Sequence, residues 1–129
     1  MQKRKRAITP KNMRALAIQI MDYLNDVGYW NGTSILVDGQ IWTSQSSGLT
    51  EYKSHTRRNT VYYIETDVDI ASRLEYSNPD TINLIFEGEL HQKINRDSDF
   101  ISILSAQFLS PYGLYFEQGH SWSMSAFKI

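Results

Sequence analysis

Three carboxylates occupy alternate positions in one segment of the chain, at Glu65, Asp67 and Asp69. Alternate residues of a β-strand project from the same face, so the three groups could together ligate a divalent cation. A solvent-facing strand decorated with acids is the commoner outcome of this pattern. The sequence therefore predicts no metal and no cofactor here, and an acidic surface that could meet a basic partner.

The segment 79–89 contains a Pro-Asp pair followed by Glu-Gly-Glu, an outline that resembles the PD-(D/E)xK nuclease motif. That motif needs a lysine two positions after its second acid, where this chain has His91, with Lys93 further on. The three histidines are far apart, and no GxSxG, P-loop or GxGxxG sequence is present. No enzymatic activity is predicted.

Positive charge is concentrated at the start of the chain. Residues 1–14 contain six basic and no acidic side chains, whereas the remaining 115 contain 7 basic and 14 acidic ones. A basic arm (1–8) on an acidic body favours contact with nucleic acid or with the acidic face of another copy, unless it is simply a solvated terminus. The candidate contact residues in the arm are Lys3, Arg4, Lys5 and Arg6.

A second basic stretch lies in the polar segment 44–59, which we interpret as a long loop. Long loops in compact domains are often functional. Cations next to a tyrosine and a histidine suit phosphate contact or base stacking, although a solvated loop has the same composition. Its candidate contact residues are Tyr52, Lys53, His55, Arg57 and Arg58.

The N-terminal half has two clear secondary-structure signals. Apolar residues recur at spacings of three and four through 10–27, from Met13 to Val27, and predict a helix that begins at Thr9-Pro10 and ends at Gly28. The segment 34–43 predicts a β-hairpin around Asp38-Gly39, with Val37 opposite Gln40, Leu36 opposite Ile41 and Ile35 opposite Trp42.

The C-terminal half predicts two strands at 60–70 and 81–90, which we expect to pair antiparallel. In the second strand, Asn83 falls on the polar, water-facing side. Because Ile85 interrupts that side and Gly88 interrupts the apolar one, we expect the strand to be either partly covered on both faces or bulged near Gly88. A helix over 98–109 and a hairpin over 114–127 follow, with Trp122 alternating inward with Met124. The sequence thus predicts a single α+β domain spanning 1–129, with an antiparallel sheet and both helices packed on it.

Composition constrains the class of protein and the compartment in which it is expected. The hydrophobic fraction of 41% is typical of globular proteins, and the absence of cysteine fits a reducing compartment. No apolar run approaches the roughly 18 residues that span a bilayer, so no membrane contact is expected.

The order of these elements resembles that of the small tail-terminator and tail-completion (neck) proteins of long-tailed phages. The segments that carry this resemblance in order and size, over most of the chain, are KNMRALAIQIMDYLNDVG, SILVDGQIWT, SQSSGLTEYKSHTRRN, VYYIETDVDI with TINLIFEGEL, DFISILSAQFL and LYFEQGHSWSMSAF. The resemblance implies a non-enzymatic, ring-forming virion protein whose loop and arm contact neighbouring subunits, located in the virion or the host cytoplasm. A small nucleic-acid-binding module, or an inhibitor of a nucleic-acid enzyme, is the alternative.

Overall fold

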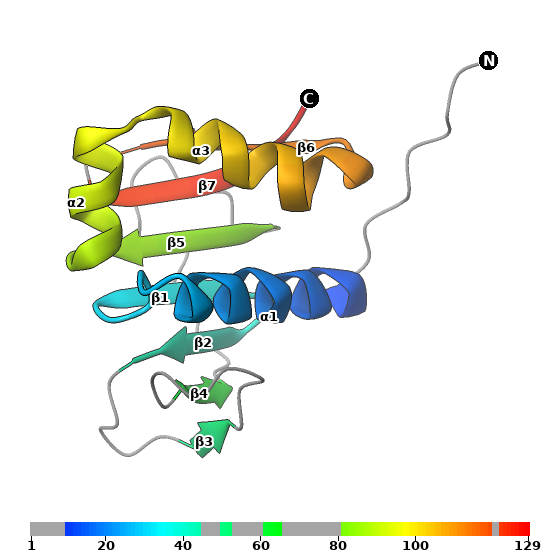
Figure 1. Ribbon diagram of the computed structural model, residues 1–129. Coiled ribbons are helices and arrows are strands. Elements are labelled where there is room, and N and C mark those ends of the chain that lie inside the picture. Colours follow the sequence, from blue (N-terminus) through cyan, green and yellow to red (C-terminus); the bar gives the residue numbers. More distant parts are fainter. Residues whose placement is uncertain (1–9, 45–49, 53–60, 66–80, 120–121) are drawn as a thin grey trace.

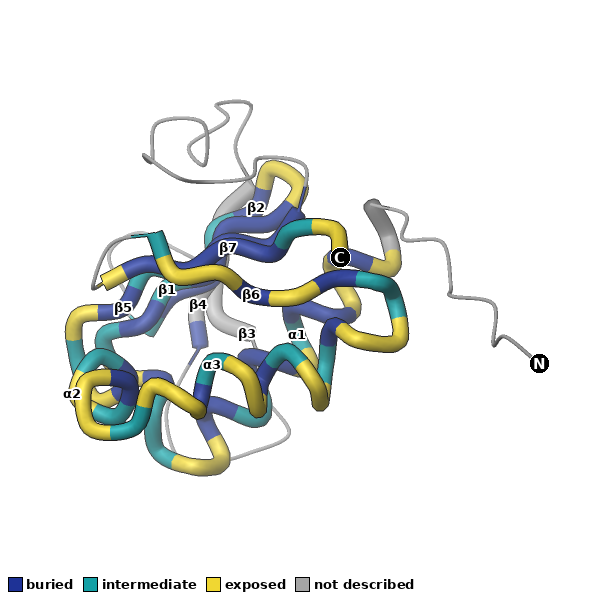
Figure 2. Tube along the Cα trace, turned by 90° about the horizontal axis from the view of Figure 1, so that it is seen from above, coloured by how far each residue is buried: buried dark blue, intermediate teal, exposed yellow. Residues whose placement is uncertain are grey.

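The computed structural model describes the backbone of residues 10–44, 50–52, 61–65, 81–119 and 122–129, and the side chains of 12–44, 61, 81–119 and 122–129. Within these ranges the strands form one antiparallel sheet, and the helices all lie on one of its faces (Figures 1 and 2). The α+β fold expected from the sequence is confirmed.

Helix α1 (Pro10–Asp26) matches the predicted helix closely. Its apolar stripe is buried from Met13 to Leu24, whereas Val27 lies beyond the helix and is partly exposed. Gly28, with φ of 88°, reverses the chain. The amide of Tyr29 then donates to the carbonyl of Leu24 at 2.8 Å, which is the Schellman arrangement that satisfies a helix end.

Strands β1 (Thr33–Val37) and β2 (Gln40–Thr43) form the predicted hairpin. Asp38 and Gly39 both have positive φ, 42° and 74°, as a two-residue turn of this kind requires. The three predicted residue pairs are confirmed. Because the register is set by the turn, the hairpin places Ile35 and Val37 on the side of the core.

The sheet order is β3-β4-β2-β1-β5-β7-β6. The strands not yet bounded are β3 (Thr50–Tyr52), β4 (Val61–Glu65), β5 (Ile82–Phe86), β6 (Leu114–Gln118) and β7 (Ser123–Lys128). The predicted pairing of the strands at 60–70 and 81–90 is wrong, since β4 pairs with β2 and β3 while β5 pairs with β1 and β7. Ile82, Leu84 and Phe86 are fully buried, and a central position in the sheet buries such a strand better than a place beside β4 would.

The strand predicted over 81–90 is shorter than expected, because the chain leaves the sheet after Phe86. Gly88 is no bulge; it precedes helix α2 (Glu89–Arg96), which the sequence reading missed. The main chain of Gly88 packs directly on that of Asn31 and Gly32, where a β-carbon would have no room. Leu90, read as part of the strand, instead packs into the core from α2.

The helix predicted over 98–109 is present as α3 (Asp99–Leu104), which continues as a π-helical turn η2 (Ser105–Leu109). Ser98 occupies the N-cap position but makes no side-chain cap hydrogen bond. A short 3-10 turn η3 (Ser110–Tyr112) then leads into β6. Three α-helices, where two had been expected, therefore lie in the part of the chain that the structure describes.

The predicted C-terminal hairpin is confirmed as β6 and β7, but Trp122 does not alternate inward with Met124. It precedes β7 and is exposed. The polar segment 44–59 also differs from the expected loop, because it contains β3. Its residues 45–49 and 53–59, and residues 66–70 of the predicted strand, lie outside the described ranges.

The two faces of the sheet have different compositions. The face that carries the helices forms the main apolar core. Four of its side chains are completely buried: Trp30, Ile35, Leu84 and Phe86. The opposite face mixes polar and apolar side chains, with Ser125, Asn83 and Leu36 in one cross-strand row. Asn83, expected in water, is only 1% exposed on this face and pairs in register with Ser125.

Candidate interaction surfaces

The residues predicted to make contacts mostly lie outside the ranges that the structure describes. Tyr52 and Glu65 are placed by their backbones alone, in β3 and β4. Tyr52 pairs with Val61, at the opposite end of β4 from Glu65, which pairs with Gln40. Four residues of strand span about 13 Å, so these two positions do not converge. The others that lie outside are Lys3, Arg4, Lys5, Arg6, Lys53, His55, Arg57, Arg58, Asp67 and Asp69.

A small apolar patch lies on the C-terminal hairpin, on the sheet face away from the helices. We call Tyr115, Phe127 and Ile129 the hairpin patch. Tyr115 of β6 pairs in register with Phe127 of β7, and their ring centroids are 6.5 Å apart. The amide of Ile129 donates to the carbonyl of Gly113 and extends the ladder by one more pair.

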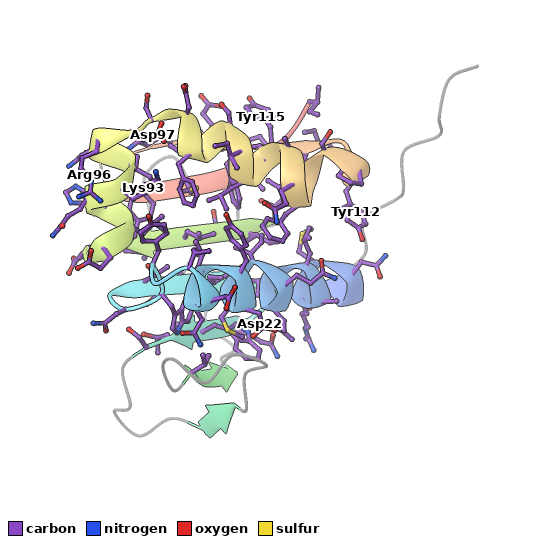
Figure 3. All side chains as sticks on the ribbon, in the orientation of Figure 1. Asp22, Lys93, Arg96, Asp97, Tyr112 and Tyr115 are labelled. Atoms are coloured by element: carbon purple, nitrogen blue, oxygen red, sulfur yellow. The ribbon has the colours of Figure 1, made fainter. Side chains whose placement is uncertain are left out.

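The hairpin patch is accessible, since Tyr115 is 37% and Ile129 is 73% exposed. Tyr115 projects from the outer rim of the sheet (Figure 3). Aromatic side chains at such positions are typical anchors of protein–protein interfaces.

Tyr115 is coupled to a neighbouring carboxylate. Its hydroxyl donates a hydrogen bond to Oε2 of Glu117 at 3.0 Å. This hydrogen bond, and then the negative charge of Glu117, raise the pKa of Tyr115 above 10.0. At neutral pH the patch therefore presents a neutral phenol beside a negative charge, which suits a protein surface better than a phosphate backbone.

The edge of the sheet at β6 is closed to a further strand near its centre. The amide N–H of Phe116 points away from β7 and donates to Oγ of Ser105 at 2.8 Å. The Ser105 hydroxyl in turn donates to the carbonyl of Ile101 at 2.9 Å. An incoming strand would need this N–H, so the helical layer protects β6 from edge-to-edge pairing.

The described part of the chain is acidic. It contains ten acidic and five basic residues, an excess of five negative charges. Two of the bases are already paired, Arg14 with Asp38 at 2.7 Å and Lys93 with Asp97 at 3.2 Å.

Lys93 also lies over the ring of Phe100, 5.5 Å from its centroid. Figure 3 shows Lys93 and Asp97 together where α2 meets α3, with Arg96 pointing outward. This surface offers little positive charge for a polyanion.

No group of three His, Asp or Glu side chains is arranged to hold a metal ion among the residues that the structure describes. Within the same part of the chain, no helix is long and apolar enough to cross a membrane.

No protein-family model matches the chain, and no match was found among curated proteins or solved structures. The fold itself defines the class, an α+β protein with helices on one face of an antiparallel sheet.

The sequence predicted the C-terminal hairpin, but the residues of the hairpin patch were not among the predicted contact residues. The signal was available in LYFEQ, where Leu114 and Phe116 alternate with Tyr115 and Glu117. The first pair is buried and the second is exposed. What the sequence did not reveal is that the second set faces away from every described helix.

Proposed function

We propose that this protein is a non-enzymatic structural protein that self-associates, as a ring component of a phage tail or neck. The observation that carries the proposal is the division of charge along the chain. Six basic and no acidic side chains lie in residues 1–14, while the part that the structure describes has an excess of five negative charges. In a ring, one patch of each subunit meets a different patch of the next, and opposite charges favour such a heterologous contact.

The hairpin patch supports an assembly role independently of the charge distribution. It offers exposed apolar area next to the negative charge of Glu117. A basic arm from a neighbouring subunit would find both kinds of contact there. Closure of the β6 edge by Ser105 disfavours the addition of a strand beside the hairpin patch and leaves contact through its side chains. In this proposal the subunits assemble in the host cytoplasm and remain in the virion.

The test is the mass of the purified chain in solution, by light scattering after size exclusion, at low and at raised salt. We expect a multimer that dissociates as salt is raised, because exposed charge pairs are screened within about 10 Å at 0.1 M. Replacing Lys3, Arg4, Lys5 and Arg6 together by glutamine should weaken association. At about 0.2–1 kcal/mol for each exposed pair, the loss is about 1–4 kcal/mol, or roughly five- to a thousandfold in Kd.

A second variant replaces Lys53, Arg57 and Arg58 by glutamine, which removes positive charge from the 44–59 segment, the other predicted contact, and leaves the arm intact. If the arm carries the contact, this variant associates more strongly than the arm variant does. A wild-type chain that stays monomeric at high concentration and low salt would contradict the proposal.

The basic arm and the basic stretch within 44–59 also favour a second candidate, a small nucleic-acid-binding module or an inhibitor of a nucleic-acid enzyme. This candidate predicts a monomer or dimer whose DNA affinity falls steeply with salt, since each neutralised phosphate releases counterions. Replacing Arg57 and Arg58 by alanine should abolish binding. A flat salt response, measured by fluorescence anisotropy on single- and double-stranded DNA, excludes it.

A further inference from the structure

The tight junction between the start of β1 and the start of α2 contains a chemically reactive pair, Asn31-Gly32. It is the one asparagine of the sequence that is followed by glycine. Asn31 is exposed to solvent, and Gly32 has φ of 83°. Glycine has no side chain to hinder attack by its own amide nitrogen, so this dipeptide is prone to spontaneous deamidation in flexible chains.

We propose that Asn31 is a latent self-modification site, which the fold keeps closed by holding the amide of Gly32 and opens when that hold is lost. This inference is independent of the proposed function. In the reaction, the Gly32 nitrogen gives up its proton to solvent base and attacks Cγ of Asn31. A new C–N bond closes a five-membered succinimide, and the side-chain amide leaves as ammonia. Water then opens the ring to aspartate or isoaspartate, and no oxidant or reductant takes part.

Three contacts hold Gly32 away from this reaction. Its N–H donates to Oγ of Ser44 at 3.0 Å, and its carbonyl accepts from the amide of Glu87 at 3.0 Å. A β-carbon on Gly32 would lie 2.9 Å from the nitrogen of Gly88, so the main chains are in close contact. The Gly32 N–H must leave its hydrogen bond with Ser44 before the nitrogen can lose its proton and attack.

The same packing makes the product incompatible with the fold. Isoaspartate routes the main chain through the former side chain and adds one methylene between residues 31 and 32. The carbonyl of Asn31 lies directly against Gly88, where even a β-carbon does not fit. A chain modified at this site therefore loses the junction on which the start of α2 depends, and modification marks molecules that have opened there.

The experiment is peptide mapping by mass spectrometry after incubation at mildly alkaline pH, with isoaspartate detected by enzymatic methylation. Folded wild-type protein should deamidate at Asn31 more slowly than the same chain in urea. Ser44→Ala removes the acceptor of the Gly32 N–H and should accelerate the reaction about two- to tenfold, the effect of losing one hydrogen bond. Ser44→Thr keeps a hydroxyl and should stay protected. Ser34→Ala is the control, since the Ser34 hydroxyl donates to Thr43 and makes no contact with Gly32 that the structure describes.

Global unfolding would also accelerate deamidation. Ser44→Ala is therefore compared with wild-type protein to which enough urea has been added to lower its free energy of unfolding to that of the variant. A higher rate of deamidation at Asn31 in the variant than in wild type of equal stability supports the proposal. Equal rates at equal stability would overturn it, as would folded wild type reacting at the rate of the unfolded chain.

Discussion

Ser105 is the residue whose removal should reveal most about how this sheet is protected. Its hydroxyl accepts from the N–H of Phe116 and donates to the carbonyl of Ile101, so it joins the helical layer to β6. Ser105→Ala leaves the Phe116 N–H without this acceptor, which costs about 1–3 kcal/mol in a part-buried setting. Alanine returns about 0.5 kcal/mol through its higher helix propensity, and the net loss is about 0.5–2.5 kcal/mol.

For a chain of this size the unfolding entropy is about 0.27 kcal/mol/K, so the expected fall in Tm is about 2–9 °C. Urea denaturation followed by circular dichroism measures the change in the free energy of unfolding. Ser102→Ala is the matched control because Ser102 is exposed on the same helix, and its effect should stay within about 0.5 kcal/mol. Ser105→Thr retains a hydroxyl and should recover much of the stability.

Ser105→Ala should also open the edge at β6, which predicts concentration-dependent aggregation by light scattering that the control does not show. If Ser105→Ala is as stable and as soluble as Ser102→Ala, the hydroxyl does not protect this edge and the reasoning is refuted.

The other predictions concern the Gly88 junction and the pH response of the hairpin patch. Gly88→Ala places a β-carbon against the carbonyl of Asn31 and should destabilise the fold by more than about 2 kcal/mol in urea denaturation; a loss below about 0.5 kcal/mol would contradict the packing. The raised pKa of Tyr115 should return toward 10.0 in Glu117→Gln but not in Glu89→Gln, as measured by NMR titration of ¹³C-labelled tyrosine. Because the folded-state pKa is the higher one, the stability contributed by this pair is fully present below about pH 10 and is lost as pH rises through the raised pKa. An unchanged Tyr115 titration in Glu117→Gln would rule out this hydrogen bond as the cause.

Local patterns in the sequence were sufficient for α1, for the first hairpin and for the helix and hairpin that end the chain. In each case a periodic apolar stripe, or a turn such as Asp38-Gly39, determines the structure within a few residues. The pairing of β5 could not be read in this way, because its partners are distant in sequence and only the burial of the assembled sheet selects them. Helix α2 was missed because Leu90 happens to fall in phase with the alternating apolar residues of β5, so the strand was extended through Gly88 to residue 90.

The candidate contact residues could be proposed only from charge and composition. Electrostatic arguments of this kind identify which segments attract a partner, and they do not place the side chains. The hairpin patch, in contrast, depends on which side of β6 faces the helices, and that is decided by the packing of Leu114 and Phe116 into the core. Alternation in the sequence separated the two sets of residues, but it did not reveal that the exposed set lies on the face away from the helices.

The central position of β1 has a consequence for how the chain acquires its structure. Its partner on one side, β2, follows within a few residues, but Ile35 meets Leu84 on the other side across about fifty positions of sequence. During synthesis the hairpin of β1 and β2 can therefore form early, while the other edge of β1 stays unpaired until β5 has been synthesised. Closing so long a loop is entropically costly and slow. The arrival of β5 is the step at which we expect the protein to commit to its native state.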